Sequence, residues 1–151
     1  MTTTMTVPST RSTASVATKT PVWRVGALAT LGGAIVTEAF SLLARAIDIP
    51  MAAADPGADA AKDIPVGGFA MAVVMWAAVG TVLAVVLARR AKRPALTFAV
   101  TTVALTVLSL LGPILATHTA TATKSVLFVA HIIAAAIVIP PITRRLAHQG
   151  R

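Results

Sequence analysis

Three ionisable residues lie inside stretches that are otherwise apolar: Glu38, Arg45 and His131. An ionisable side chain within a membrane is unfavourable unless it is paired, hydrated or neutralised, so each one is a candidate for function. With a helical rise of about 1.5 Å per residue, Glu38 is expected roughly 13 Å and His131 roughly 9 Å from the same membrane face. The two could therefore meet across a helix interface, either as a proton relay or as a buried structural pair. Arg45 lies nearer the interface, where snorkelling to lipid headgroups is expected.

Hydroxyl side chains recur at helical spacing in the same stretches. Ser41 lies on the face shared by Glu38 and Arg45, and Thr106 and Ser109 lie three residues apart in another stretch. Small hydroxyl residues let membrane helices approach closely and hydrogen-bond to one another, so these faces are expected to point into a bundle. The sequence therefore predicts a polar pocket of six residues: Glu38, Ser41, Arg45, Thr106, Ser109 and His131.

Recognisable catalytic and metal-binding motifs do not occur in the chain. It contains no cysteine and three histidines, and His118 and His131 lack the close spacing of paired metal ligands. A phosphate-binding loop, an HExxH motif and a dinucleotide fingerprint are also missing. We therefore predict no catalytic residue, no metal ion and no cofactor.

Four long apolar stretches position the candidate residues. Hydrophobic residues make up 56% of the 151-residue chain and charged residues 12%, whereas soluble domains average roughly 25% charged residues. About 20 helical residues cross a hydrocarbon core of about 30 Å. The pattern predicts an all-α membrane protein, an antiparallel four-helix transmembrane bundle forming one domain over residues 23–146. Its spans are expected at residues 23–46, 66–88, 95–116 and 125–142.

The basic residues are distributed unequally between the two sides of such a bundle. Ten of the thirteen fall on the side of the termini, and only Arg45, Lys62 and Lys124 fall on the other. The lysine and arginine bias predicts an N-in, C-in multi-pass protein of the cell (plasma or inner) membrane. The net charge of +8 is thus interpreted as an orientation signal and as contacts with anionic lipids of the bilayer, and no nucleic-acid partner is expected.

The segments outside the spans are short or polar. Residues 1–22 are rich in serine and threonine, a composition that predicts a disordered cytoplasmic tail. Residues 147–151 are expected to form a second, short cytoplasmic tail. Residues 48–65 predict the largest extracellular loop, with a short helical turn at Met51–Ala54. The same small residues offer an alternative, in which the first span is a cleaved signal peptide. The apolar stretch of this span, Val25–Leu43, is 19 residues long, which exceeds the length of a signal core, and it contains Glu38. We therefore keep the four-span interpretation.

Two proline sites predict irregular helices. Gly112-Pro113 predicts a kink near the end of the third span, because proline lacks the backbone N–H and clashes with the preceding turn. Pro140-Pro141 predicts that the fourth helix distorts before the basic tail.

Three stretches carry a resemblance to a known family. They are Glu38–Asp48, Val66–Gly80, and Leu108–Pro113 continued through Ala130-His131 to Ile139-Pro140. In these stretches the chain resembles a family of small four-span integral membrane proteins of unknown function from high-GC, actinobacterial-type bacteria. The resemblance covers residues 23–146. It implies a four-helix membrane bundle and carries no activity with it.

Three functional hypotheses follow from these observations. The leading one is non-enzymatic: a small helix-bundle subunit that packs with a membrane-protein partner or with itself. The second is a proton-linked transporter or permease that uses Glu38 and His131. The third is a membrane enzyme acting on a lipid or isoprenoid, with His131 as its general base.

Overall fold

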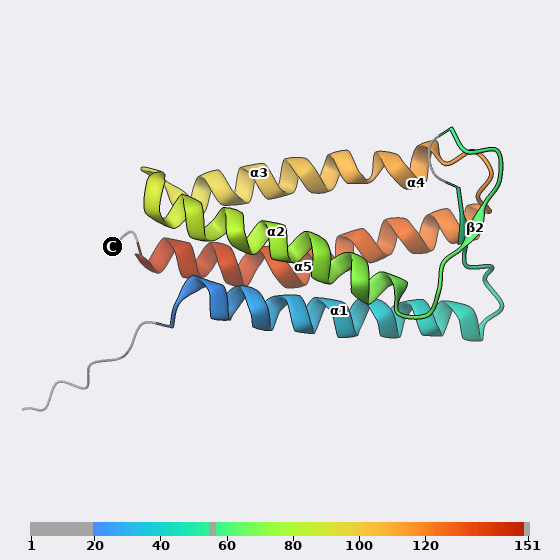
Figure 1. Ribbon diagram of the computed structural model, residues 1–151, viewed down its shortest axis with the longest axis horizontal. Helices are drawn as coiled ribbons and strands as arrows, with labels where there is room; N and C mark the ends of the chain where they lie inside the picture. The colour runs from blue at the N-terminus through green and yellow to red at the C-terminus, as the bar shows by residue number, and fades with distance from the viewer. Residues whose placement is uncertain (1–19, 55–56, 150–151) are drawn as a thin grey trace, which may run out of the picture.

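The structure, a computed structural model, describes residues 20–54 and 57–149. Four helical segments in this part are long and apolar enough to cross a membrane, which confirms the predicted fold class. They run antiparallel, so α1 begins and α5 ends at the same end of the bundle (Figure 1). The predicted N-terminal tail lies outside the described residues except for its last three. The helices are α1 (Val22–Ala46), α2 (Gly68–Arg90), α3 (Pro94–Ser109), α4 (Leu111–Leu115) and α5 (Thr121–Gln149).

The third span is interrupted as its proline predicts. α3 ends at Ser109, and α4 begins two residues later, with Leu110 between them. Pro113 has no backbone N–H to donate to the carbonyl of Ser109, so the helical ladder cannot pass this point unchanged. α3 and α4 together form one span, Pro94–Leu115.

The fourth span is longer than predicted. α5 begins at Thr121 and continues as a helix through Pro140 and Pro141 to Gln149, whereas the sequence predicted a span that ends at residue 142 and a tail from residue 147. Packing explains the difference, because Ile142 and Leu146 are fully buried beyond the prolines. Their burial stabilises the final turns, and prolines are tolerated in membrane helices when tertiary contacts compensate.

The loop between α1 and α2 forms a small β-hairpin. Strands β1 (Ala52–Ala53) and β2 (Lys62–Asp63) pair antiparallel, with Ala52 opposite Asp63. The predicted helical turn at Met51–Ala54 is therefore wrong. We call this end of the bundle the hairpin end, and the opposite end, where α2 meets α3 at a run of basic residues, the basic end.

α1 ends in a backbone motif that directs the chain into the hairpin. The amide of Ile49 donates to the carbonyl of Ala44, and the amide of Asp48 donates to that of Arg45. Asp48 has a φ of 59°, the left-handed conformation that this type of helix end requires. An aspartate adopts it more readily than most non-glycine residues, so the turn is encoded locally.

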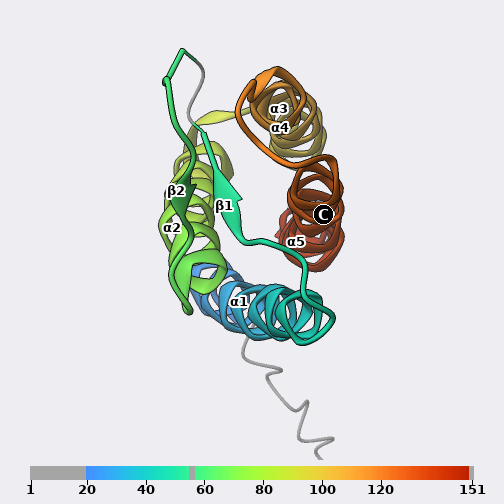
Figure 2. The same ribbon diagram turned by 90° about the vertical axis from the view of Figure 1, so that its right-hand side faces the viewer.

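The helices do not surround the bundle axis evenly. α1 packs against both α2 and α5, and α3 packs mainly against α5, whereas α2 and α3 contact each other much less. Viewed from the hairpin end, α2 and α3 lie apart, with α1 and α5 joining them on the other side (Figure 2). The bundle is therefore tightly packed on the α1 side and loosely packed between α2 and α3.

Two small cores hold the ends of the bundle. The basic-end core comprises Val22, Ala84, Phe98, Ile142 and Leu146. The hairpin-end core comprises Ala44, Met51, Phe69, Val126 and Ala130. Much of the remaining apolar surface faces outward, and Leu28, Met71 and Trp76 are each 69% exposed. Such a perimeter suits a hydrocarbon environment, where helices satisfy their own backbone polar groups.

Close packing of α1 on α2 gives a first testable prediction. A Cβ atom added at Gly26 would lie 2.5 Å from side-chain atoms of Thr81, whereas one at Gly80 would have no neighbour within 4 Å. We expect Gly26→Ala to lower the free energy of unfolding by about 1 kcal/mol or more through overpacking. The matched Gly80→Ala should be neutral or stabilising by a few tenths, since alanine favours the helix. Denaturant titration in mixed micelles measures both, and equal stabilities would contradict the close contact.

Candidate functional site

The carboxylate of Glu38 caps the start of α2. Its Oε1 accepts a hydrogen bond from the amide of Gly67 at 2.7 Å, and its Oε2 accepts one from the amide of Ala70 at 3.0 Å. Gly67 is the N-cap residue of α2, and Ala70 is the third residue of the helix. The first amides of a helix have no partner within it, so one side chain from α1 satisfies two of them. The negative charge also complements the positive end of the helix dipole.

The local backbone makes room for this cap. Gly67 has a φ of 87°, a left-handed conformation that glycine adopts without steric cost. The preceding Pro65 accepts a hydrogen bond from the amide of Gly68, which tightens the turn into the helix. The sequence around Gly67 thus supplies a turn but no capping side chain, and the cap comes from Glu38, 29 residues earlier.

Arg45 connects the hairpin to α1 through a hydrogen bond. Its Nη2 donates to the carbonyl of Ile64 at 2.5 Å, at the end of β2. Its Nε is buried and has no hydrogen-bond partner among the residues that the structure describes, and the same is true of Oγ of Ser41, one turn away. Arg45 therefore holds the loop in place, whereas the sequence predicted that its side chain would reach lipid headgroups.

Two threonines of the hairpin end complete this attachment. The amide of Ala54 donates to Oγ1 of Thr119 at 2.9 Å. The hydroxyl of Thr123, which is fully buried, donates to the carbonyl of Pro50. The hairpin is thus tied to α1, to α5 and to the loop before α5.

A cleft of about 680 Å³ lies between the two cores. α1, α2, α3 and α5 all contribute to its walls, and Ile64 of the hairpin reaches it as well. Phe69 and Phe98 line the cleft and also belong to the hairpin-end and basic-end cores, so the cores close its two ends. A volume in the range of roughly 300–1,000 Å³ is typical of small-molecule sites.

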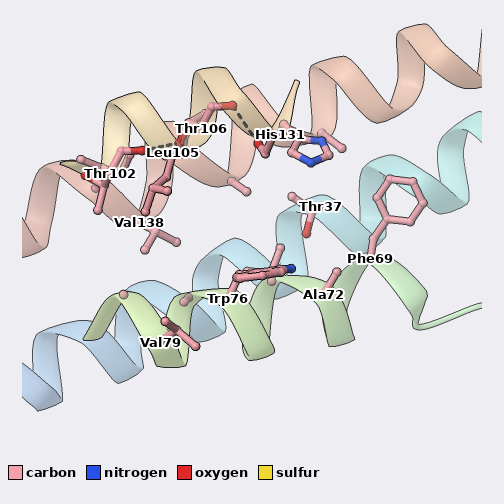
Figure 3. Close-up of a pocket in the computed structure, with 18 of the residues that line it drawn as sticks. Thr37, Phe69, Ala72, Trp76, Val79, Thr102, Leu105, Thr106, His131 and Val138 are labelled. Carbon is pink, nitrogen blue, oxygen red and sulfur yellow. Dashed lines mark hydrogen bonds between the residues drawn. The ribbon is translucent and has the colours of Figure 1, made fainter. Parts of the chain in front are cut away.

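The cleft opens sideways, between α2 and α3. The lining residues Trp76 and Val79 of α2 are 69% and 58% exposed, and Leu105 and Leu108 of α3 are 54% and 61% exposed. These side chains form the two edges of the cleft, and Val79 and Leu105 lie on opposite walls (Figure 3). In a membrane-spanning bundle, such an opening faces the lipid.

The hydroxyl groups of the cleft all donate to their own helices. Thr37 donates to the carbonyl of Gly33 at 2.7 Å. On α3 the same arrangement repeats along one face (Figure 3). There Thr102 donates to Phe98, Thr106 to Thr102 and Ser109 to Thr106, at 2.7 to 2.8 Å. Each hydroxyl proton is therefore already engaged, while the oxygen can still accept a hydrogen bond.

His131 projects from α5 into the space between the helices (Figure 3). Its Nδ1 lies 2.7 Å from the carbonyl of Leu127. A carbonyl oxygen can only accept, so Nδ1 carries the proton and Nε2 of the neutral ring is an acceptor. Nε2 has no hydrogen-bond partner among the described residues and is not fully buried, and His131 is one of the residues that line the cleft.

The predicted polar pocket divides into two separate groups. His131, Thr106 and Ser109 line the cleft. Glu38, Ser41 and Arg45 are not among its lining residues. Glu38 caps α2 and Arg45 binds the hairpin. Glu38 and His131 bind different partners and do not form the pair that their predicted depths allowed. Sequence reasoning missed Phe69 and Phe98, because only their packing in the two cores shows that they lie at the ends of the cleft.

The fold and the cleft define a class, the multi-pass α-helical membrane proteins with a cavity inside the span region. The chain belongs to a family of unknown function, DUF6069, whose profile matches residues 17–148. No curated protein matches the chain. No solved structure matches it either.

The capping role of Glu38 gives a second prediction. Glu38→Ala should lower the free energy of unfolding by about 2 kcal/mol, because two amides lose a charged acceptor. Glu38→Gln should cost less, since its amide keeps one acceptor oxygen. A double-mutant cycle compares the free energies of unfolding of Glu38→Ala, His131→Ala and the double variant with that of the unsubstituted protein. Denaturant titration in mixed micelles measures all four.

The cycle distinguishes two roles for Glu38: a cap of α2, or one partner of a Glu38–His131 pair. Because the two side chains share no hydrogen-bond partner, their effects should add to within roughly 0.5 kcal/mol. A coupling energy above about 1 kcal/mol would show that the two residues act together and would contradict the assignment of Glu38 to α2.

Proposed function

We propose that this protein is a non-enzymatic membrane protein that binds a hydrophobic membrane component in the cleft between α2 and α3. The observation that carries the proposal is the cleft itself, which is closed at both ends by packed cores and open at its side. A molecule already dissolved in the bilayer can enter such a site without crossing water. Apolar cavities with a few polar groups are the usual form of small-molecule sites.

The contacts of Glu38 weigh against the transporter hypothesis. A proton relay would need Glu38 and His131 to exchange a proton, directly or through water, but both carboxylate oxygens of Glu38 accept backbone amides of α2. The two cores also interrupt any path along the bundle axis. A binding function requires neither a relay nor a continuous path.

The lining of the cleft also favours binding over catalysis. Among the described residues that line it, His131 is the only side chain with an imidazole, carboxylate or amine. The hydroxyl groups donate to helix carbonyls and are not arranged with His131 as an activated nucleophile. If His131 acted as a general base, the described lining residues would therefore supply no nucleophile and no carboxylate to work with it.

We place the protein in the plasma (inner) membrane with both termini in the cytoplasm. Arg89 and Arg90 end α2, and Lys92 and Arg93 lie in the turn before α3. These four basic residues are at the same end of the bundle as Arg24 of α1 and Arg144 of α5. A positive end of this kind is retained on the cytoplasmic side.

Blocking the cleft tests the proposal. Ala72 lines the cleft and Ala78 does not, although both lie on α2 and both are exposed. We expect the purified parent protein to retain a specific hydrophobic molecule, and Ala72→Phe to lose most of it by filling the site. Ala78→Phe should retain it. Organic extraction and mass spectrometry, compared with the bulk lipid composition, measure the retention.

The same samples distinguish the other occupants. Retention of bulk lipids only, or equal retention by both variants, would contradict the proposal. If Ala72→Phe instead dissociates a larger complex in mild detergent, while Ala78→Phe does not, the cleft holds a helix of a second copy or of a membrane-protein partner.

A further inference from the structure

We infer that the ligand of the cleft is an uncharged, apolar alcohol or phenol whose hydroxyl group donates a hydrogen bond to Nε2 of His131. This inference rests on the proposed function and specifies the chemical class that the site selects. It follows from the hydrogen-bonding groups that the cleft leaves free.

The free polar atoms of the cleft are almost all acceptors. Thr37, Thr102, Thr106 and Ser109 have already donated their protons to backbone carbonyls, so only their oxygen lone pairs remain. Nε2 of His131 is a further acceptor, since Nδ1 holds the proton. Among the described side chains of the lining, only the indole N–H of Trp76 is left as a donor.

This inventory discriminates between classes of membrane lipid. Ester and quinone carbonyls are acceptors only, so such a ligand would leave Nε2 of His131 without a hydrogen-bond donor. An unpaired polar group in an apolar site is unfavourable by an amount comparable to a lost hydrogen bond. A hydroxyl group supplies the missing donor, and it can also accept from Trp76.

The charge and the volume of the cleft restrict the class of ligand further. No charged side chain lies among the described lining residues, so a phosphate or an ammonium group would be buried there without an opposite charge, which is unfavourable. Apolar side chains of four helices make up most of the walls, and the volume of about 680 Å³ accommodates a chain or ring system of drug-like size. An isoprenoid, polycyclic or aromatic body with one hydroxyl group meets these conditions.

His131 is the acceptor that decides the orientation. It extends from α5 into the cleft, opposite the wall formed by Trp76 and Thr37 (Figure 3). Its Nδ1 contact with Leu127 orients the ring and selects the tautomer that leaves Nε2 bare. A ligand hydroxyl at this position would lie between the two cores, with its apolar body toward the opening.

A matched pair of probes tests the inference. Geranylgeraniol and its methyl ether share the same chain, but only the alcohol can donate a hydrogen bond. The chain has two tryptophans, so Trp23→Phe leaves Trp76 as the only indole and its fluorescence reports binding within the cleft. We expect the Trp23→Phe protein in detergent micelles to bind the alcohol roughly tenfold more tightly than the ether.

Substitution at His131 assigns the preference to one acceptor. In Trp23→Phe/His131→Phe the preference for the alcohol over the ether should fall to about twofold or less. The helical circular dichroism spectrum and the elution volume of this variant, compared with those of Trp23→Phe, show whether it is folded. The matched control Trp23→Phe/His118→Phe, changed at an exposed loop histidine, should keep the full preference.

Three results would overturn the inference: equal affinity for both probes, a preference that persists without His131, or no binding of either probe. Equal affinity would leave the proposed hydrophobic binding intact, because only the selection by hydrogen bonding would have failed. If neither probe binds, the retention experiment with Ala72→Phe decides separately whether the cleft binds a different hydrophobic molecule.

Discussion

The position of α2 depends on how its first amides are satisfied. A helix that begins in or near a membrane leaves several N–H groups without partners, and leaving them unpaired is strongly unfavourable. Glu38 of α1 supplies both acceptors, one to Gly67 and one to Ala70. Further along, Gly26 lets α1 approach Thr81 of α2 closely. α2 thus contacts α1 closely at two places along its length, near Glu38 and near Gly26, whereas its contact with α3 is less extensive.

The cleft is the consequence of this attachment. The turn after α2 joins it to α3 at the basic end, and α3 packs mainly against α5. The cleft between α2 and α3 is therefore not filled by side chains of either helix. The two cores close the space at its ends and leave its side open to lipid. The polar groups within are mostly acceptors because membrane helices use their own carbonyls to satisfy serine and threonine hydroxyls. A hydrophobic ligand that brings a donor would complete the site.

The sequence predicted the spans well because span length and hydropathy are local properties. It also predicted the break near Pro113, where a missing N–H acts locally. The helical turn at Met51–Ala54 was wrong because the hairpin depends on distant contacts, such as that of Arg45 with Ile64. Glu38 and His131 were identified as unusual residues, but their depths alone could not show that Glu38 would cap a helix 29 residues away. His131, Thr106 and Ser109 were assigned to a pocket that they do line.

The central claim is that α2 is attached to α1 and separated from α3, and cross-linking tests it most directly. The chain has no cysteine, so introduced pairs report without background. A Cβ at Gly33 would lie 3.3 Å from Cγ1 of Val73 on α2, whereas Val79 and Leu105 lie on opposite walls of the cleft (Figure 3). In native membranes, Gly33→Cys/Val73→Cys should form a disulfide readily under mild oxidation, and Val79→Cys/Leu105→Cys should not. Efficient cross-linking of the second pair would show that α2 and α3 close together and would contradict the account.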